Sequence, residues 1–251
     1  MKFENTEVTG FENAILGARL PMCKNLEEAK EKSDSDYICA GVTTKENGEF
    51  KVHQGNFHIG EKDLDLLKRL INADDKIGQP NSKFLRMIHA QVCITAPLYW
   101  WKEMDTYKVG TTANSTSTMH KLANTPITKE CFEMDDFENM SPRMFKCKDE
   151  YGDTYEENNL CNFISLDLFW CHLIDVLNDY RVHYNETKDE RYWKELIRLL
   201  PESWLQTRMF DCDYATLRNI YCWRKTHKLT EWHKFCEWVE TLPYAKELII
   251  N

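Results

Sequence analysis

Two segments of this sequence gather residue types that bind anionic ligands. The first is Gly110–Ser117, a run of threonine, serine and asparagine that is preceded by Lys108 and followed by His120. Hydroxyls, an amide and backbone N–H groups beside a cation are the groups that phosphate oxygens accept hydrogen bonds from. A β-strand rich in threonine and serine has the same composition, so the segment predicts either a phosphate-binding loop or a strand.

The second segment, Leu217–Lys225, places cations and an amide among aromatic residues. Asn219 and Arg224 are five positions apart. Five residues turn a helix by roughly 500°, or about 140° net, so one helix can present these two side chains to different ends of an extended ligand. The alternative interpretation is an amphipathic core helix with arginines on its surface.

The composition favours small ligands over a nucleic-acid polymer. Of 251 residues, 42% are hydrophobic, and 41 acidic against 32 basic residues give a net charge of −9. The apolar fraction is enough for a hydrophobic core, and the negative net charge disfavours binding to the phosphate backbone of a nucleic acid. The glycine-rich nucleotide motifs and the His-Glu-x-x-His motif are absent from the sequence, and the histidine spacings do not suit a metal pair, so we expect no metal site.

The cysteine pattern is that of a reducing compartment. Ten cysteines are scattered without a Cys-x-x-Cys pair, so we expect free thiols and a cytoplasmic protein. The start of the chain lacks the pattern of a signal peptide, and no apolar run approaches the roughly 18 residues of a membrane span. The expected partners therefore include no membrane.

Apolar spacing and capping residues predict an α+β fold in one domain covering residues 1–251, with strands early and helices late. Two strands are expected around Val42 and Val52, and a surface loop over 128–159. Helices are predicted over Phe11–Leu20, Leu64–Ile71, Leu98–Tyr107, Ser165–Tyr184, Asp189–Leu200 and Thr230–Thr241. A further helix is predicted to begin at Asp213 or Tyr214 and to end at Lys225.

Read together, the two polar segments resemble the flavin-dependent thymidylate synthases, also called thymidylate synthase complementing proteins. That family has an Ala-Pro, a short aromatic-rich helix, and then Arg-His-Arg-x-x-Ser-x-Asn-x-x-Ser-x-Arg. Here Ala96-Pro97 leads without a gap to Thr106-Tyr107-Lys108, and one extra residue brings Asn114 and Ser117 onto the motif's asparagine and second serine.

The second block is closer to the family pattern. The family has a Leu-Pro, twelve residues later an Asn-x-Arg that touches flavin, and then Leu-x-Asn-Phe-Leu-x-Leu-Arg on one helix. This chain has Leu200-Pro201, Asp213-Tyr214-Ala215 at the same spacing, and Leu217–Arg224. Arg224 falls on the family arginine that promotes ionisation of the uracil N3, and Asn219 on a flavin-contacting asparagine.

The resemblance implies an antiparallel sheet flanked by helices, with a helical C-terminal third. It also implies FAD as cofactor, NADPH and methylenetetrahydrofolate as co-substrates, and transfer of a one-carbon unit to C5 of a pyrimidine deoxynucleotide, in the first place dUMP to dTMP. The assembly would be a homotetramer with active sites where subunits meet. A guanidinium that stays protonated suits this chemistry, because it stabilises negative charge that develops on the uracil ring.

The same resemblance assigns the site residues. Arg224 would be catalytic. Substrate binding would involve Glu103, Thr106, Ser115, Ser117, Arg198 and Arg224. Cofactor binding would involve Lys83, Arg86, Thr106, Tyr107, Lys108, Asn114, Asp213 and Asn219.

Several family positions are filled differently. Arg-His-Arg has become Thr106-Tyr107-Lys108, and Glu103 stands where the family has a nucleotide-contacting glutamine. Charge-assisted hydrogen bonds contribute about 1.5–3 kcal/mol each, so these losses weaken the expected flavin and phosphate contacts. The alternative is therefore a catalytically altered relative that binds a nucleotide without thymidylate synthase activity, or that modifies a different pyrimidine nucleotide.

Overall fold

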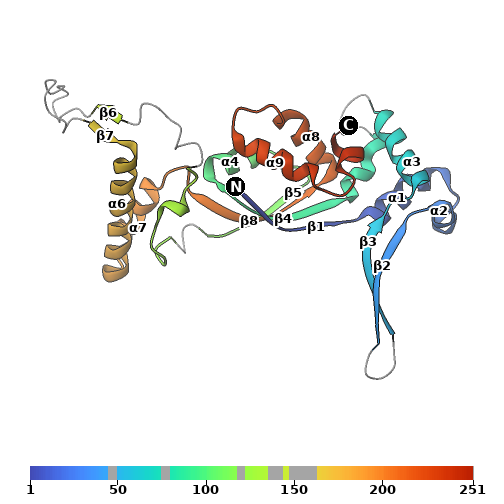
Figure 1. Ribbon diagram of the computed structural model, residues 1–251, viewed down its shortest axis with the longest axis horizontal. Coiled ribbons are helices and arrows are strands. Elements are labelled where there is room, and N and C mark those ends of the chain that lie inside the picture. The colour runs from blue at the N-terminus through green and yellow to red at the C-terminus, as the bar shows by residue number, and fades with distance from the viewer. Residues whose placement is uncertain (45–49, 75–79, 118–121, 135–143, 147–162, 251) are drawn as a thin grey trace. The chain divides into compact units, whose positions relative to one another are not determined.

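The computed structural model describes residues 1–44, 50–74, 80–117, 122–134, 144–146 and 163–250 (Figure 1). They form two compact units. The larger unit comprises residues Lys2–Ile94, Met104–Asn114 and Met209–Asn251. The smaller unit comprises Met1, Thr95–Glu103 and Ser115–Arg208. That residues 1–251 behave as one domain stays a prediction.

A four-stranded sheet has the order β1 (Lys2–Thr9), β4 (His89–Pro97), β8 (Leu205–Asp213) and β5 (Thr111–Ser115). Backbone bonds join Leu98 to Trp204 at one end of β4 and Ile88 to Tyr214 at the other, so β4 and β8 are antiparallel. Strand β5 supports the strand interpretation of the polar segment over Thr111–Ser115. The predicted α+β class with an antiparallel sheet and flanking helices is confirmed.

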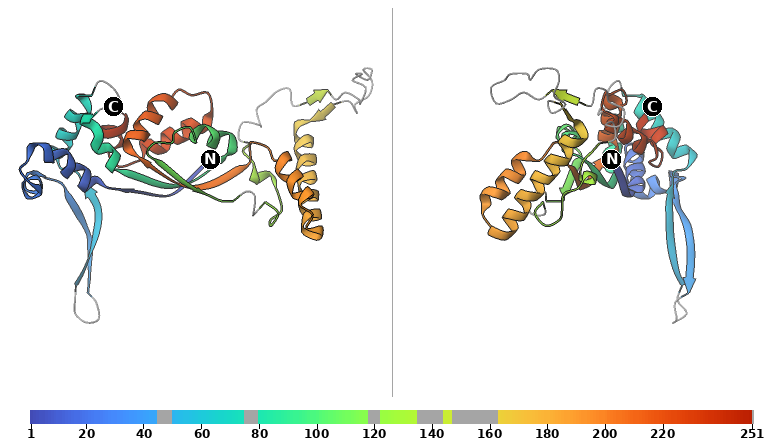
Figure 2. Two further views of the ribbon diagram at one scale, coloured as in Figure 1. Left: turned by 180° about the vertical axis from the view of Figure 1, so that it is seen from behind. Right: turned by 60° about the vertical axis from the view of Figure 1, so that its left-hand side comes forward.

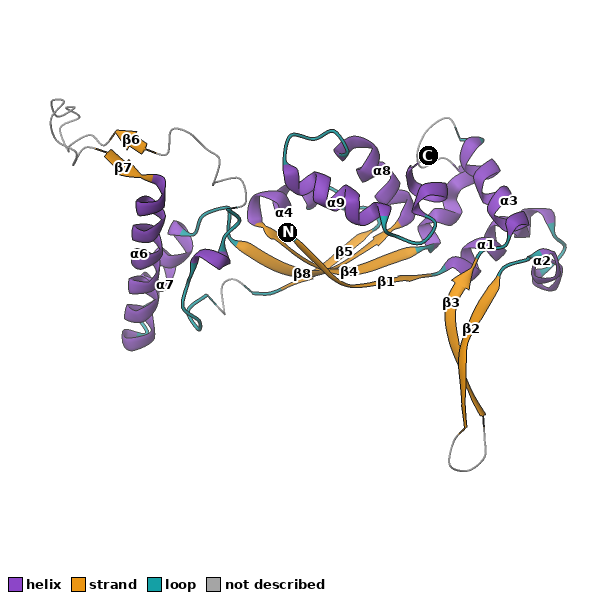
Figure 3. Ribbon diagram, viewed as in Figure 1, coloured by secondary structure: helices purple, strands orange, loops and turns teal. Residues whose placement is uncertain are grey.

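Strand β4 shows why this segment forms a sheet. Ala90, Val92, Ile94 and Ala96 are fully buried, whereas the residues between them are exposed or half-buried. This alternation has the period of two that a strand with one covered face requires. In the larger unit, α8 (Tyr214–Arg224) and α9 (Thr230–Glu240) lie on one face of the strands (Figure 3).

The predicted helices are present, with small shifts at their ends. They are α1 (Phe11–Arg19), α3 (Glu61–Asn72), α4 (Leu98–Met104), α6 (Leu166–Thr187), α7 (Glu190–Leu199), α8 and α9. The structure also has a helix that was not predicted, α2 (Leu26–Lys32), and α4 ends three residues before the expected Tyr107. The C-terminal third is helical as expected but also contains β8, an inner strand of the sheet, so strands and helices interleave more than the sequence indicated.

The remaining strand and helix pairs each join elements that follow one another along the chain. Strands β2 (Asp36–Thr44) and β3 (Phe50–His58) are the two expected strands and pair antiparallel, and β6 (Met144–Lys146) pairs with β7 (Phe163–Ser165). In the smaller unit α6 packs against α7 (Figure 2). Of the loop expected over 128–159, residues 135–143 and 147–159 lie outside the described residues. No helix in the described ranges is both long and apolar enough to cross a membrane.

A buried carboxylate connects helices α1 and α3 with the segment that follows α2 in the larger unit. Asp63, in the first turn of α3, is 0% exposed and pairs with Arg19 of α1. It also accepts hydrogen bonds from the hydroxyls of Ser33 and Ser35, both at 2.6 Å, and from the backbone N–H of Asp34 at 3.1 Å. Helix α1 in turn packs against the 3-10 segment Pro80–Met87.

We predict that Asp63→Ala lowers the free energy of unfolding by about 3–5 kcal/mol, because it leaves Arg19 without its buried counter-charge. Urea unfolding followed by circular dichroism measures this difference. The matched control is Asp65→Ala on the same helix, whose exposed pair with Arg69 is expected to contribute at most about 1 kcal/mol. Equal losses in the two variants would contradict the assigned role of Asp63.

Candidate functional site

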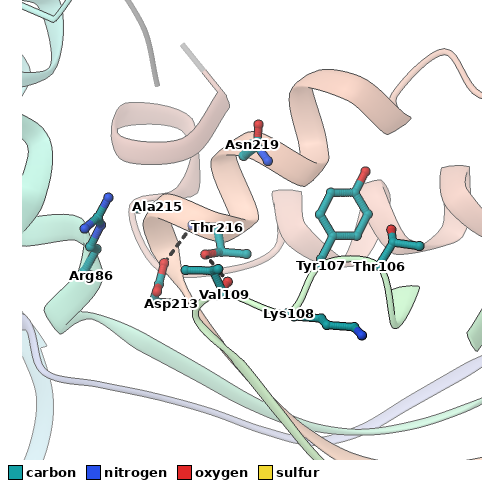
Figure 4. A pocket seen from close by; sticks show the side chains of 9 residues that line it. All are labelled: Arg86, Thr106, Tyr107, Lys108, Val109, Asp213, Ala215, Thr216 and Asn219. Carbon is teal, nitrogen blue, oxygen red and sulfur yellow. Dashed lines mark hydrogen bonds between the residues drawn. The ribbon is translucent and has the colours of Figure 1, made fainter. Parts of the chain in front are cut away.

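The site is built at the junction where β8 ends and α8 begins. Asp213, only 6% exposed, is the N-cap of α8, and its Oδ1 accepts a hydrogen bond from the backbone N–H of Thr216 at 2.7 Å. The backbone N–H of Asp213 donates to the carbonyl of Gly110 at 3.0 Å. The Thr216 hydroxyl donates to the carbonyl of Val109 at 3.0 Å. These bonds fix the segment before β5 against the first turn of the helix (Figure 4).

Gly110 is required at this junction by two independent features. Its φ of +74° lies in the left-handed region that side chains disfavour. A Cβ there would also lie 2.1 Å from Asp213 Oδ2 and 2.4 Å from Thr216 Oγ1. The backbone can therefore approach the helix cap only because the residue has no side chain.

A cavity of about 370 Å³ opens beside this junction. Its walls come from the 3-10 segment Pro80–Met87, the stretch between α4 and β5, and the start of α8 (Figure 4). It is lined by Arg86, Thr106, Tyr107, Lys108, Val109, Asp213, Ala215, Thr216 and Asn219. All nine belong to the larger unit.

The charge of the cavity favours an anionic ligand. Arg86 and Lys108 are exposed, and within the described part of the chain neither forms an ion pair. Against these two positive charges stands one carboxylate, Asp213, which leaves the lining with a formal charge of +1. In a chain whose net charge is −9, this is a local reversal of sign that would attract phosphate groups.

Arg224 lies at the other end of α8 and is held by two aromatic residues. Its Nε donates a hydrogen bond to the hydroxyl of Tyr107 at 2.8 Å. Its Cζ lies 4.5 Å from the ring centroid of the fully buried Trp232 and 5.4 Å from that of Tyr107. Planar guanidinium groups are stabilised over such ring faces. Because Tyr107 also lines the cavity, it connects Arg224 to the pocket.

The structure brings together most of the predicted cofactor-binding residues. Six of the eight line the cavity: Arg86, Thr106, Tyr107, Lys108, Asp213 and Asn219. Lys83 and Asn114 do not, and both side chains are exposed. Asp213 was expected to bind the cofactor, and in the structure its carboxylate caps α8. Among the residues that the structure describes, no cluster of three or more metal-ligating side chains occurs.

The predicted substrate-binding residues are divided between the units. Thr106 and Arg224 belong to the larger unit, and Glu103, Ser115, Ser117 and Arg198 to the smaller one. Arg198 is exposed on α7 and pairs with Glu195 one turn away. Glu103 and Ser117 are half-buried, and Ser115 is exposed at the end of β5.

Sequence reasoning missed four residues of this site. Val109, Ala215 and Thr216 line the cavity, and Trp232 packs on Arg224. The sequence did hold a signal for Thr216. Asp is a preferred N-cap residue, and its side chain accepts a hydrogen bond from the backbone N–H three residues later, which here is that of Thr216. No signal marks Val109, whose carbonyl, rather than its side chain, is bonded by Thr216.

Comparison with known proteins gives structural likeness without sequence matches. No family model matches the chain, and no curated protein does. Two crystal structures of the flavin-dependent thymidylate synthase ThyX from Helicobacter pylori with FAD and dUMP align at 15% identity, with TM-scores of 0.56 and 0.57. The alignments cover 99% and 100% of this chain and 98% of each ThyX chain.

A third structure, the UMP/dUMP methylase PolB from Streptomyces cacaoi bound with 5-Br dUMP, aligns at 10% identity with a TM-score of 0.51. It covers 98% of this chain and 94% of that one. The chain thus shares its fold with these three solved structures. More particularly, this fold is the flavin-dependent thymidylate synthase fold, and the resemblance seen in the sequence is confirmed at that level.

We predict that Gly110→Ala destabilises the protein by about 1–3 kcal/mol, because the new Cβ strains the backbone and displaces the cap of α8. The midpoint of urea unfolding measures the loss. Gly17→Ala is the matched control, because Gly17 lies inside α1 and its Cβ would first meet the flexible end of Met87 at 3.4 Å. That control should be neutral or stabilising by up to about 1 kcal/mol. A Gly110 variant as stable as the control would contradict the account of the junction.

Proposed function

We propose that this chain is an FAD-dependent enzyme that transfers a one-carbon unit from methylenetetrahydrofolate to C5 of a pyrimidine deoxynucleotide, in the first place dUMP to dTMP. The observation that carries the proposal is the position of Arg224, bonded to Tyr107 at the edge of a positively charged cavity. The solved structures of this fold that hold FAD and dUMP support both ligand classes. The seven cysteines with described thiols are free, which supports a cytoplasmic location.

The residues of the cavity fit part of FAD. Arg86 and Lys108 supply cations for a diphosphate, and Asn219 and Thr106 supply hydrogen-bonding groups for the polar edge of a flavin ring. At about 370 Å³ the cavity is at the small end of ligand sites, which run from about 300 to 1,000 Å³. In the homotetramer that the resemblance implies, a second copy would complete the site. NADPH would serve as the reductant.

Arg224 would activate the pyrimidine. C5 of uracil is a weak nucleophile until electron density is pushed into the ring, and a cation near N3 stabilises the anion that this produces. Because Tyr107 holds Nε and Trp232 packs on the guanidinium plane, the group is oriented before the substrate arrives. Bound reduced flavin would supply the hydride that completes the methyl group, and no cysteine nucleophile is needed.

A second candidate function follows from a departure at this site. Where the family pattern has a histidine between two arginines, Tyr107 stands here with its hydroxyl bonded to Arg224. Glu103, unlike a glutamine, cannot donate a hydrogen bond when ionised. A relative that binds a pyrimidine nucleotide without thymidylate synthase activity, or modifies a different one, accommodates both changes. The fold of a protein described as a UMP/dUMP methylase supports the second of these forms.

We predict that Arg224→Ala lowers kcat by about 100-fold or more, because it removes a preorganised charge from the developing anion. Release of tritium from C5-labelled dUMP, in the presence of FAD, NADPH and methylenetetrahydrofolate, measures turnover. Arg224→Lys should restore little of this activity, since an ammonium lacks the planar guanidinium group that Tyr107 and Trp232 hold. Arg191→Ala, at an arginine side chain 88% exposed on α7, is the control and should keep full activity.

The same assay separates the candidates. Wild-type protein that releases tritium from dUMP supports thymidylate synthesis. Release from labelled UMP but not from dUMP supports modification of a different nucleotide. Binding of both labelled nucleotides with their tritium fully retained supports a binding protein. An Arg224→Ala variant as active as wild type would rule out the catalytic role given to Arg224.

A further inference from the structure

An exposed tryptophan, Trp223, lies on α8, the helix that forms one wall of the cavity. Among the described large apolar side chains, the three most exposed are Val109 at 82%, Met22 at 80% and Trp223 at 71%. Val109 lines the cavity, and Trp223 follows Asn219, which also lines it, by one turn of α8. Tryptophan is normally buried over most of its surface, so an indole left in water at the edge of a ligand site indicates a surface that a ligand covers.

The positions on α8 form one continuous face. Thr216, Asn219 and Trp223 are spaced i, i+3 and i+7, and residues at these intervals lie on the same side of a helix. The seven steps from Thr216 to Trp223 advance about 10 Å along the helix axis. Val109 is tied to one end of this face by its carbonyl, which accepts the Thr216 hydroxyl. The polar side chains of Thr216 and Asn219 thus lie between two apolar side chains, those of Val109 and Trp223.

Trp223 also fixes the orientation of the Asn219 amide. The indole Nε1–H donates to Asn219 Oδ1 at 3.2 Å. An indole nitrogen is a donor only, so the amide must turn its oxygen toward Trp223. The Nδ2 group then points away from the indole and is available as a donor to an acceptor on a ligand in the cavity that Asn219 lines.

We propose that the indole face of Trp223 stacks on the isoalloxazine ring of bound flavin while the Asn219 amide donates to the polar edge of that ring. The proposal rests on the FAD-dependent function proposed above. A face about 10 Å long suits a three-ring system better than a single pyrimidine. The family pattern has leucine at this position, so the tryptophan is a feature of this chain. It supplies a contact where the loss of Arg-His-Arg removes others.

The test is titration of the purified full-length protein with FAD, followed by calorimetry and by the visible absorption of the flavin. Trp223→Leu should weaken FAD binding by about tenfold or more, as expected for loss of one aromatic stacking contact. Trp223→Phe retains an aromatic ring, so its affinity for FAD should stay within about threefold of that of wild type. A shift of the visible flavin band should accompany binding to wild type and to Trp223→Phe but not to Trp223→Leu.

Met22→Ala is the control, since it removes an equally exposed apolar side chain that does not line the cavity. It should leave FAD affinity unchanged. Trp223→Leu with wild-type affinity and the same flavin band would overturn the stacking role and leave the proposed function intact. Wild-type protein that binds no FAD would overturn both. Light scattering gives the mass of each variant, and a Trp223→Leu defect that tracks a loss of assembly would overturn direct stacking.

Discussion

The cap of helix α8 is the interaction on which the site depends. Asp213 bonds through its carboxylate to the N–H of Thr216 and through its own N–H to the carbonyl of Gly110. One residue thereby ends the inner strand β8, begins the helix and anchors the segment that leads into β5. The helix then sets the intervals at which Asn219, Trp223 and Arg224 follow. An N-cap carboxylate is worth about 1 kcal/mol for a helix, but here it also fixes the geometry of a cavity.

The chemistry of the site arises from charge held against aromatic surface. The Arg224 guanidinium packs on the ring of Trp232 and donates a hydrogen bond to the hydroxyl of Tyr107. The positive charges of Arg86 and Lys108 are exposed and outnumber the single carboxylate of the cavity. An acidic protein can in this way present a local positive field to phosphate groups, which keeps the preference for small anionic ligands consistent with a net charge of −9.

Much of the fold follows from local patterns in the sequence. Helix α8 was predicted from its apolar spacing, and two strands were predicted around Val42 and Val52, where β2 and β3 lie. Strand β8 was missed because its sequence, LQTRMFDCD, mixes polar and apolar residues, and most of its side chains are only half-buried. The bond between Tyr107 and Arg224 joins residues 117 positions apart and depends on the sheet between them, so no local pattern reports it.

A structure of the protein with FAD and dUMP bound would show whether Arg224 contacts the pyrimidine. We expect flavin in the cavity lined by Lys108 and Asn219, with the pyrimidine ring within hydrogen-bonding distance of the Arg224 guanidinium. Flavin bound at a different surface, or a pyrimidine out of reach of Arg224, would contradict the function proposed for this site.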